Sequence, residues 1–230
     1  MYRSDSGELA TARAELVRYG ERLLADGLSV GSAGNLSVRV GDAVAITPSG
    51  VPYPDMTAAA ICLVALDGRR LDADGGDGGQ PETPSSETPM HLAIYAATGA
   101  AAVVHTHSPE VVALSASRRE LPAIHYAVTE LGGPVLVAPY QRFGSDQLAA
   151  AAVTALNGRR AVILRNHGAV VYGADLAQAY HRAVLLEWLA RAYRLALAYG
   201  EPVVLSEAQL EEVAAESRRR RYGSGRPPRS

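Results

Sequence analysis

Two histidines stand one residue apart in the stretch Val103-Val104-His105-Thr106-His107-Ser108-Pro109. The apolar residues before them predict a buried strand, and Ser108-Pro109 predicts the cap and first residue of a helix. Because side chains alternate along a strand, His105 and His107 lie on the same face. Such a pair is a candidate metal site, although a half-buried strand also carries histidines for packing. A metal site further needs a third ligand and a carboxylate.

Composition limits the class of protein. With 230 residues, 48% of them hydrophobic, the chain can build one substantial core, and we expect a single domain over residues 1–217. A net charge of −2 creates no strong field for nucleic acid or an anionic membrane, so small-molecule partners are expected. The single cysteine, Cys62, and the lack of a signal peptide or a membrane-spanning apolar run predict a cytoplasmic protein.

Helix and strand patterns alternate along the chain and predict an α/β fold with a mixed sheet covered by helices. Helices are expected at 8–26, 86–98, from 109 through at least 114, at 146–156 and at 176–199, and extended segments at 36–40, 43–47, 60–66, 101–107, 121–129, 135–138, 161–165 and 169–172. Residues 72–84, rich in Gly, Asp and Pro, predict a flexible surface loop. The arginine-rich residues 218–230 predict a disordered basic tail.

A third imidazole and an acid are available elsewhere in the chain. His167 follows a predicted buried strand and precedes a glycine, which permits close approach of the backbone. Three neutral imidazoles suit Zn²⁺ or a similar divalent ion. Glu87 is the candidate acid, although a glutamate at a helix start also serves to stabilise the helix dipole. His91, one helical turn later, either orients this acid or is a satisfied core histidine.

Small hydrogen-bond donors gather in three turns. Gly34-Asn35, Thr47-Pro48-Ser49-Gly50 and Ser85-Ser86 can bind an anion such as phosphate through N–H and hydroxyl groups, although each alone is typical of a turn. The sequence contains no lysine at all, which excludes a Schiff base formed by the chain itself.

The motifs and their order resemble those of the class II aldolase/adducin family over roughly residues 8–215. The residues that carry the resemblance are Gly34-Asn35-Leu36-Ser37, Thr47-Pro48-Ser49-Gly50, Ser85-Ser86-Glu87 with Met90-His91, His105-Thr106-His107-Ser108-Pro109 and Asn166-His167-Gly168. Three further pieces are similar to the L-fuculose-1-phosphate aldolase branch of that family, namely Pro122 to Tyr126, Pro139-Tyr140 and Phe143-Gly144.

The resemblance implies a fold, an assembly and a site. The fold is a three-layer α/β/α sandwich with a central mixed, largely antiparallel sheet, and the assembly is a homotetramer with sites between subunits. Zn²⁺ is then held by His105, His107, His167 and Glu87. The substrate phosphate is bound by Asn35, Ser49, Gly50, Ser85 and Ser86, with Gly34 and Thr47 as supporting turn residues. Tyr126 is expected to reach a neighbouring subunit's site.

The implied reaction is reversible cleavage of a ketose 1-phosphate, such as L-fuculose 1-phosphate, to dihydroxyacetone phosphate and a short aldehyde. Zinc acts as a Lewis acid, Glu87 transfers the C3 proton, and Tyr126 handles the proton on the aldehyde oxygen.

Four alternatives on the same scaffold stay open. The family's pentulose-phosphate epimerases typically carry aspartate where Glu87 stands. Its dehydratases carry a catalytic glutamate near Tyr126, and Glu130 of this chain is nearby but displaced from that position. A decarboxylase is a third possibility. The fourth is a non-catalytic, adducin-like interaction module, which would contain no stoichiometric metal. The sequence does not identify the aldehyde.

Overall fold

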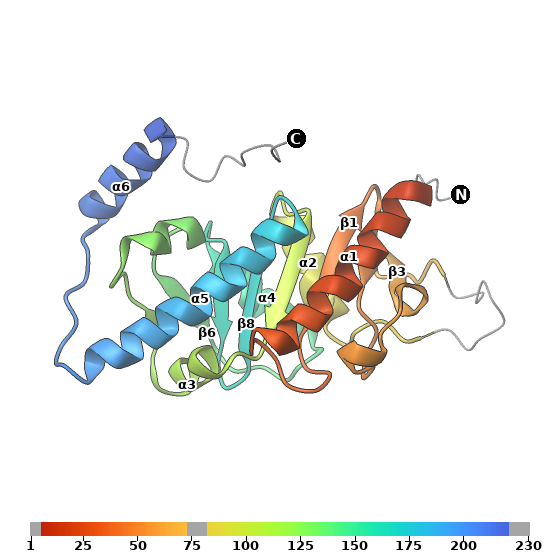
Figure 1. Cartoon of the computed structure of the whole chain (residues 1–230), viewed down its shortest axis with the longest axis horizontal. Helices are drawn as coiled ribbons and strands as arrows, with labels where there is room; N and C mark the ends of the chain where they lie inside the picture. The colour runs from red at the N-terminus through yellow and green to blue at the C-terminus, as the bar shows by residue number, and fades with distance from the viewer. Residues whose placement is uncertain (1–5, 73–81, 221–230) are drawn as a thin grey trace.

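The computed structural model describes residues 6–72 and 82–220, which form a mixed eight-stranded sheet between two layers of helices (Figure 1). The strand order is β3-β2-β1-β4-β8-β7-β6-β5. Neighbouring strands pair antiparallel except β6 and β7, which pair parallel. The predicted α/β/α sandwich with a largely antiparallel sheet is thereby confirmed.

The strands lie close to their predicted positions. They are β1 (Asn35–Val40), β2 (Ala43–Ile46), β3 (Cys62–Ala65), β4 (Ala102–Thr106), β5 (Glu120–Leu121), β6 (Val135–Ala138), β7 (Ala161–Leu164) and β8 (Gly168–Gly173). The first two form the predicted hairpin, in which Val40 pairs with Ala43 across the turn.

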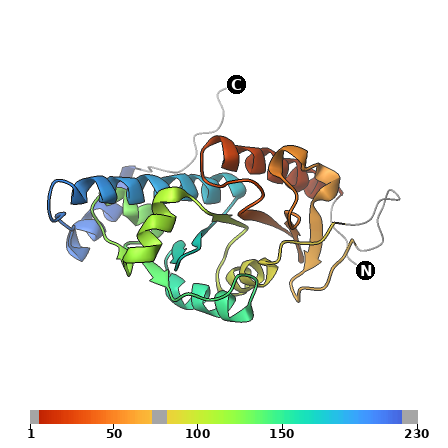
Figure 2. The same cartoon turned by 90° about the horizontal axis from the view of Figure 1, so that it is seen from below.

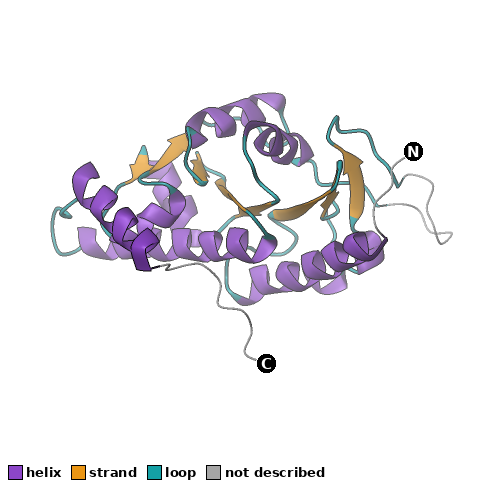
Figure 3. Ribbon diagram, turned by 90° about the horizontal axis from the view of Figure 1, so that it is seen from above, coloured by secondary structure: helices purple, strands orange, loops and turns teal. Residues whose placement is uncertain are grey.

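Helices cover both faces of the sheet, as Figures 2 and 3 show from opposite sides. One face carries α1 (Ser6–Ala25), α3 (Pro109–Ser117) and α5 (Leu176–Leu197), and the other carries α2 (Thr88–Ala97) and α4 (Asp146–Leu156). Strand alternation divides the core between them: Val104 of β4 packs into the cluster under α1, α3 and α5, whereas Val103 packs into the cluster under α2 and α4. The face on which a β1 or β4 residue lies therefore decides which helices it meets.

Several helix ends confirm the capping signals. The side chains of Ser145 and Asp175 accept hydrogen bonds from the backbone N–H groups of Leu148 and Gln178, at the starts of α4 and α5. Helix α4 ends at Asn157, which adopts the left-handed conformation with φ of 40°.

One predicted extended segment is wrong beyond its first residue. Strand β5 ends at Leu121, residues 122–125 are irregular, and the 3₁₀ helix η3 (Tyr126–Leu131) includes the last four residues of the segment expected to be extended to Thr129. The local cause is His125, whose Nδ1 accepts a hydrogen bond from the backbone N–H of Ala127 and caps this helix. Two shorter 3₁₀ helices, η1 (Tyr53–Asp55) and η2 (Ala58–Ala60), lie between β2 and β3.

The C-terminal segment contains a helix that was not predicted from the sequence. Helix α6 (Glu207–Arg220) packs against η3 and includes the first three arginines of the predicted tail, so that prediction is wrong for residues 218–220. Ion pairs from Glu216 to Arg219 and Arg220, at helical spacing, stabilise its last turn. Residues 221–230, and residues 73–81 of the predicted loop, lie outside the described residues.

None of the helices in the described part of the chain combines the length and apolar character that crossing a bilayer requires.

Candidate metal centre and substrate pocket

The sheet register brings the predicted site residues to one end of three neighbouring strands. Strand β4 lies between β1 and β8, and His105 of β4 pairs with Asn35 of β1. At the end of β4, Thr106 pairs with Ala169 of β8. His107 directly follows β4 and His167 directly precedes β8, so both histidines lie at this same end of the sheet. Residues far apart in the sequence thus converge through antiparallel pairing.

The turn before β8 requires its particular residues. Asn166 has φ of 53°, a left-handed conformation that asparagine tolerates better than most residues. A Cβ added at Gly168 would lie 2.1 Å from the carbonyl oxygen of Thr106, so no larger residue fits there. The missing side chain at Gly168 lets the backbones of β4 and β8 approach closely and places the ring of His167 beside those of the other two histidines.

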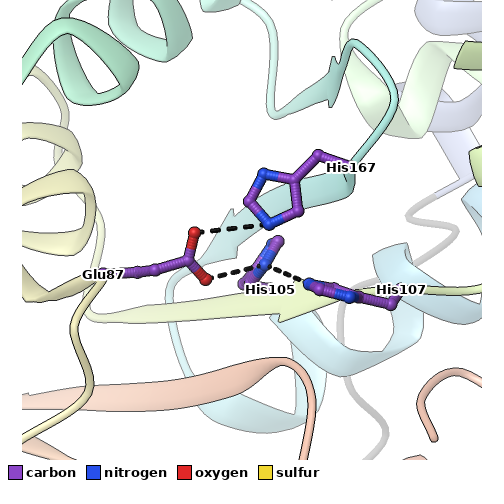
Figure 4. Close-up of side chains that lie close together, drawn as sticks. All are labelled: Glu87, His105, His107 and His167. Atoms are coloured by element: carbon purple, nitrogen blue, oxygen red, sulfur yellow. Dashed lines mark hydrogen bonds and ion pairs between the residues drawn. The ribbon is translucent and has the colours of Figure 1, made fainter. Parts of the chain in front are cut away.

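Glu87 occupies the cap position of α2 without acting as a cap, because its side chain makes no capping hydrogen bond. Its carboxylate turns instead toward the histidines (Figure 4). Oε2 lies 2.9 Å from Nε2 of His105 and accepts a hydrogen bond of 3.0 Å from Nδ2 of Asn35. Oε1 lies 3.4 Å from Nε2 of His167. The helix-dipole alternative therefore does not explain where this side chain lies.

The three imidazole rings surround a common point. Their centroids are 4.7 Å apart for His105 and His107 and 4.8 Å apart for each pair that includes His167. Nε2 of His105 and Nε2 of His107 face one another at 2.8 Å. Nδ1 of His105 donates a hydrogen bond of 2.9 Å to the carbonyl oxygen of Ala169. That bond fixes the ring and leaves the Nε2 lone pair for a ligand in the neutral form.

Charges in this buried cluster are strongly coupled. Burial by itself raises the pKa of Glu87, but the charge and hydrogen bond of His105, together with His167 and Asn35, outweigh it and hold that pKa well below its ordinary value. Burial likewise lowers the pKa of His105, and the Glu87 carboxylate overcomes this and raises it. Burial and the neighbouring His105 lower the pKa of His107 to about 3 and that of His167 to about 4.

The four side chains fit a divalent cation. Each offers one ligand atom, and the four atoms lie within 4.8 Å of one another. Two buried polar atoms of the cluster, Oε1 of Glu87 and Nδ1 of His167, have no hydrogen-bond partner. Three imidazole nitrogens and one carboxylate form a donor set that suits Zn²⁺ and related divalent ions. The structure thus brings together all four predicted ligands, His105, His107, His167 and Glu87.

A cavity of about 300 Å³ opens directly above this cluster. Glu87, His107 and His167 line it, and so do six of the seven residues predicted for phosphate binding, namely Gly34, Asn35, Ser49, Gly50, Ser85 and Ser86. The seventh, Thr47, lies behind the wall, where its hydroxyl accepts from the N–H of Leu36 and its carbonyl accepts from the N–H of Ser85. Neither lysine nor arginine is among the described residues that line the cavity.

Other lining and supporting residues were not assigned a role from the sequence. Tyr140 and Phe143, which are 63% and 61% exposed, lie at the cavity wall together with Asn166. Both aromatic residues belong to motifs that carry the family resemblance, and this was the available signal. His91 is fully buried and contacts Asn35, so it is a satisfied core histidine that also reaches the acid's neighbour.

Tyr126 lies away from the cavity of its own chain. It is 56% exposed, stacks on His125 at a centroid distance of 4.4 Å, and is not among the residues that line the cavity. Glu130 on the same 3₁₀ helix forms an exposed ion pair with His181 at 3.0 Å. The structure therefore does not bring Tyr126 or Glu130 to the metal centre within one chain.

The fold agrees with what comparison with known proteins finds. Residues 14–194 match the family described as the Class II Aldolase and Adducin N-terminal domain. The chain therefore belongs to the class II aldolase and adducin family, which confirms the predicted resemblance.

Three relatives illustrate the match. A 5-deoxy-D-ribulose 1-phosphate aldolase of Bacillus thuringiensis serovar kurstaki is 36% identical over 209 residues, which cover 90% of this chain and 95% of that protein. An L-fuculose phosphate aldolase of Escherichia coli strain K12 is 38% identical over 190 residues, covering 81% and 85%. A solved structure of an L-fuculose 1-phosphate aldolase superimposes with a TM-score of 0.84 at 34% identity, covering 90% of this chain and 96% of that one.

Proposed function

We propose that this protein is a zinc-dependent aldolase that reversibly cleaves a ketose 1-phosphate to dihydroxyacetone phosphate and a short aldehyde. Its family and its aldolase relatives make it a lyase acting on sugar phosphates. The observation that carries the more specific proposal is the carboxylate of Glu87, which lies among three imidazoles at the base of a cavity lined by hydroxyl and N–H donors.

The substrate phosphate binds at the part of the cavity formed by Ser49, Gly50, Ser85 and Ser86. Ser85 and Ser86 precede the N-terminus of α2, where the helix dipole favours an anion, and Ser49 and Gly50 in the turn after β2 line the same cavity. Gly50, with φ of 74°, adopts a left-handed conformation that glycine supplies without strain. Hydrogen bonds can therefore hold the phosphate without a basic side chain.

Glu87 transfers the proton at C3 of dihydroxyacetone phosphate. A bound divalent cation supplies Lewis-acid stabilisation of the negative charge on the ketose oxygens. Oε1 of Glu87 has no hydrogen-bond partner, so one carboxylate oxygen is free to take or give a proton, while Asn35 holds the other. Since the chain has no lysine, it cannot stabilise this charge through an imine of its own.

Tyr126 serves the aldehyde oxygen of a neighbouring subunit's substrate. Its distance from the cavity of its own chain and its exposed ring support a site completed between subunits. The homotetramer and the cytoplasmic location are part of this proposal.

The aldehyde is lactaldehyde or acetaldehyde. Cleavage of L-fuculose 1-phosphate between C3 and C4 releases lactaldehyde, and the same cleavage of a 5-deoxypentulose 1-phosphate releases acetaldehyde. Relatives named for both substrates match this chain at similar identity. The dehydratase alternative loses support because Glu130 pairs with His181 on the surface. The epimerase alternative is disfavoured by glutamate rather than aspartate at position 87.

The test is incubation of the zinc-loaded protein with dihydroxyacetone phosphate and, separately, lactaldehyde, acetaldehyde and glycolaldehyde. We expect a ketose 1-phosphate product with at least one aldehyde and loss of product after treatment with a chelator. Restoring zinc should restore the product. A protein that binds about one zinc per chain but forms no product with any aldehyde would refute the aldolase proposal. A protein that binds no stoichiometric metal would favour the adducin-like alternative.

A further inference from the structure

A row of buried polar side chains extends from Glu87 away from the three histidines of the metal centre. Glu87, His91 and Tyr95 follow one another at a spacing of four residues, from the N-cap of α2 to its last turn, and so share one face of this helix. Asn35 and Ser37 alternate along β1 and share the strand face that meets this helix. All five are buried, with exposed fractions of 0% for His91 and Ser37. Burying a polar group costs free energy unless the group is hydrogen-bonded, so these residues need the hydrogen bonds that they make with one another.

The side chains of this row are joined by a continuous series of hydrogen bonds. Oε2 of Glu87 lies 3.0 Å from Nδ2 of Asn35, and Oδ1 of Asn35 lies 2.6 Å from Nε2 of His91. Nδ1 of His91 lies 2.7 Å from the hydroxyl of Ser37, which lies 2.8 Å from the hydroxyl of Tyr95. Glu87 is the only one of the four proposed metal ligands that takes part in this row of hydrogen bonds.

The donor and the acceptor of each of these hydrogen bonds can be assigned in turn, starting from the carboxylate of Glu87. An ionised carboxylate can only accept, so the Asn35 amide turns its N–H group to Glu87 and its oxygen to His91. The oxygen can only accept, so Nε2 of His91 carries the proton. The neutral ring then has a bare Nδ1, which accepts from the hydroxyl of Ser37. The hydroxyl of Ser37 in turn accepts from the hydroxyl of Tyr95. Each donor in the row therefore donates to the neighbour on its Glu87 side.

We propose that His91 is a positioning residue for the acid: by donating from Nε2 to Asn35, it locks the amide in the orientation that presents N–H to Glu87. The proposal rests on the proposed function in giving Glu87 the proton transfer at C3. Without the donor at position 91, the amide of Asn35 can rotate by half a turn. Its oxygen then faces the carboxylate of Glu87, and an attractive contact becomes a repulsive one.

A merely structural histidine would fill the same space but would not require one tautomer. The first test is therefore ¹⁵N NMR of the histidine rings in the metal-free wild-type protein at pH 7.5, with the His91 signals identified by their loss in His91→Gln. We expect a neutral ring protonated at Nε2. A ring protonated at Nδ1, or at both nitrogens, would overturn the proposal, because Asn35 would then be oriented differently. This result does not depend on whether the protein is an aldolase.

The second test compares His91→Leu with His91→Gln in the zinc-loaded protein. Glutamine can donate to Asn35 from its amide nitrogen and accept from Ser37 at its amide oxygen, whereas leucine does neither. We expect His91→Leu to lower kcat about 10- to 100-fold, the range of a lost charge-assisted hydrogen bond, with KM for dihydroxyacetone phosphate changed less than about threefold. His91→Gln should recover most of the loss. Bound zinc per chain should be the same in both variants.

The control is Thr98→Val at the other end of α2, where the hydroxyl bonds to the local backbone at Ile94 and Ala100. It should match the wild type. Equal losses in His91→Leu and His91→Gln, or a loss that appears in zinc content, would overturn the positioning role. If His91→Leu does not fold, the test rests on His91→Gln. A wild-type kcat in His91→Gln, together with the Nε2 tautomer, would support the proposal. A loss of kcat in His91→Gln as large as that in Glu87→Gln would overturn it. A wild-type protein without aldolase activity would count against the proposed function, and the tautomer alone would then decide the inference.

Discussion

The two side chains assigned to proton transfer lie in opposite surroundings. Glu87 is 5% exposed and is held by Asn35 and His105, whereas Tyr126 is 56% exposed and stacks on the neighbouring His125. One chain therefore completes the buried half of the site by its own packing. The other half lies at the surface, where a second copy of the chain can complete it. Disturbing each half separately should thus have distinct consequences.

The largest expected effect comes from removing a ligand in the buried half. His105→Ala should lose stoichiometric zinc and lower aldolase activity by about 1,000-fold or more, because the Lewis acid and the fixed partner of Glu87 disappear together. The measurement is metal analysis and activity on the same dialysed sample. The control is His181→Ala, which removes an exposed histidine. Full zinc content in His105→Ala would show that the cluster is not the metal site.

The exposed half is tested with Tyr126→Phe. We expect activity to fall about 100-fold with zinc content unchanged, because a general acid is lost and no ligand is touched. The control is Tyr199→Phe, which changes a tyrosine that is 95% exposed and lies two residues after the end of α5.

Mixing inactive Tyr126→Phe with inactive Glu87→Gln sharpens the comparison. Hybrid assemblies that place an intact Tyr126 beside an intact Glu87 should regain part of the activity. No recovery after verified exchange of subunits would contradict a site shared between copies of the chain.

A smaller effect is expected in the pH dependence of stability, and it comes from His91 in the buried half. Burial, with the charge of His105, lowers the pKa of His91 to about 3 from its ordinary value of 6.5, and Glu87 opposes this only in part. The unfolded chain therefore binds a proton that the folded chain excludes. Stability contributed by the neutral ring is complete above pH 6.5 and is lost as pH falls toward 3, by up to about 1.4 kcal/mol per pH unit.

Urea unfolding of the metal-free protein at pH 7.5 and pH 5 measures this. The wild type should lose about 1 to 2 kcal/mol more than His91→Gln between the two pH values. His181→Gln, which changes an exposed histidine, should follow the wild type. Equal losses in the wild type and His91→Gln would mean that His91 is not buried in its neutral form.

Local sequence patterns predict much of this fold, since alternation, caps and turn residues are read over a few positions. The starts of α4 and α5 at Ser145 and Asp175 are examples. The His105 and His107 pair could be placed on one strand for the same reason. What joins His167 and Glu87 to that pair is the order β1-β4-β8 and the packing of α2, and a single sequence does not specify these. The family resemblance supplied that information.

The features that the sequence did not reveal depend on contacts between distant segments. The sequence left the role of His91 open between orienting the acid and filling the core, because that role depends on one face of α2 meeting one face of β1, more than 50 residues away in the chain. The 3₁₀ helix that carries Tyr126 replaces an expected extended segment because His125 caps it. Helix α6 has few apolar residues and none that is buried, so its periodic signal is weak.

The most direct measurement of the central claim is exchange of the C3 hydrogen of dihydroxyacetone phosphate with deuterium oxide, in the absence of aldehyde. It isolates the step assigned to Glu87 from Tyr126 and from the choice of aldehyde. We expect the zinc-loaded wild type to exchange this hydrogen, and Glu87→Gln to lose exchange by at least about 100-fold while its three histidines still bind zinc. Exchange by zinc-loaded Glu87→Gln at the wild-type rate would contradict the role of Glu87 as the acid of this site.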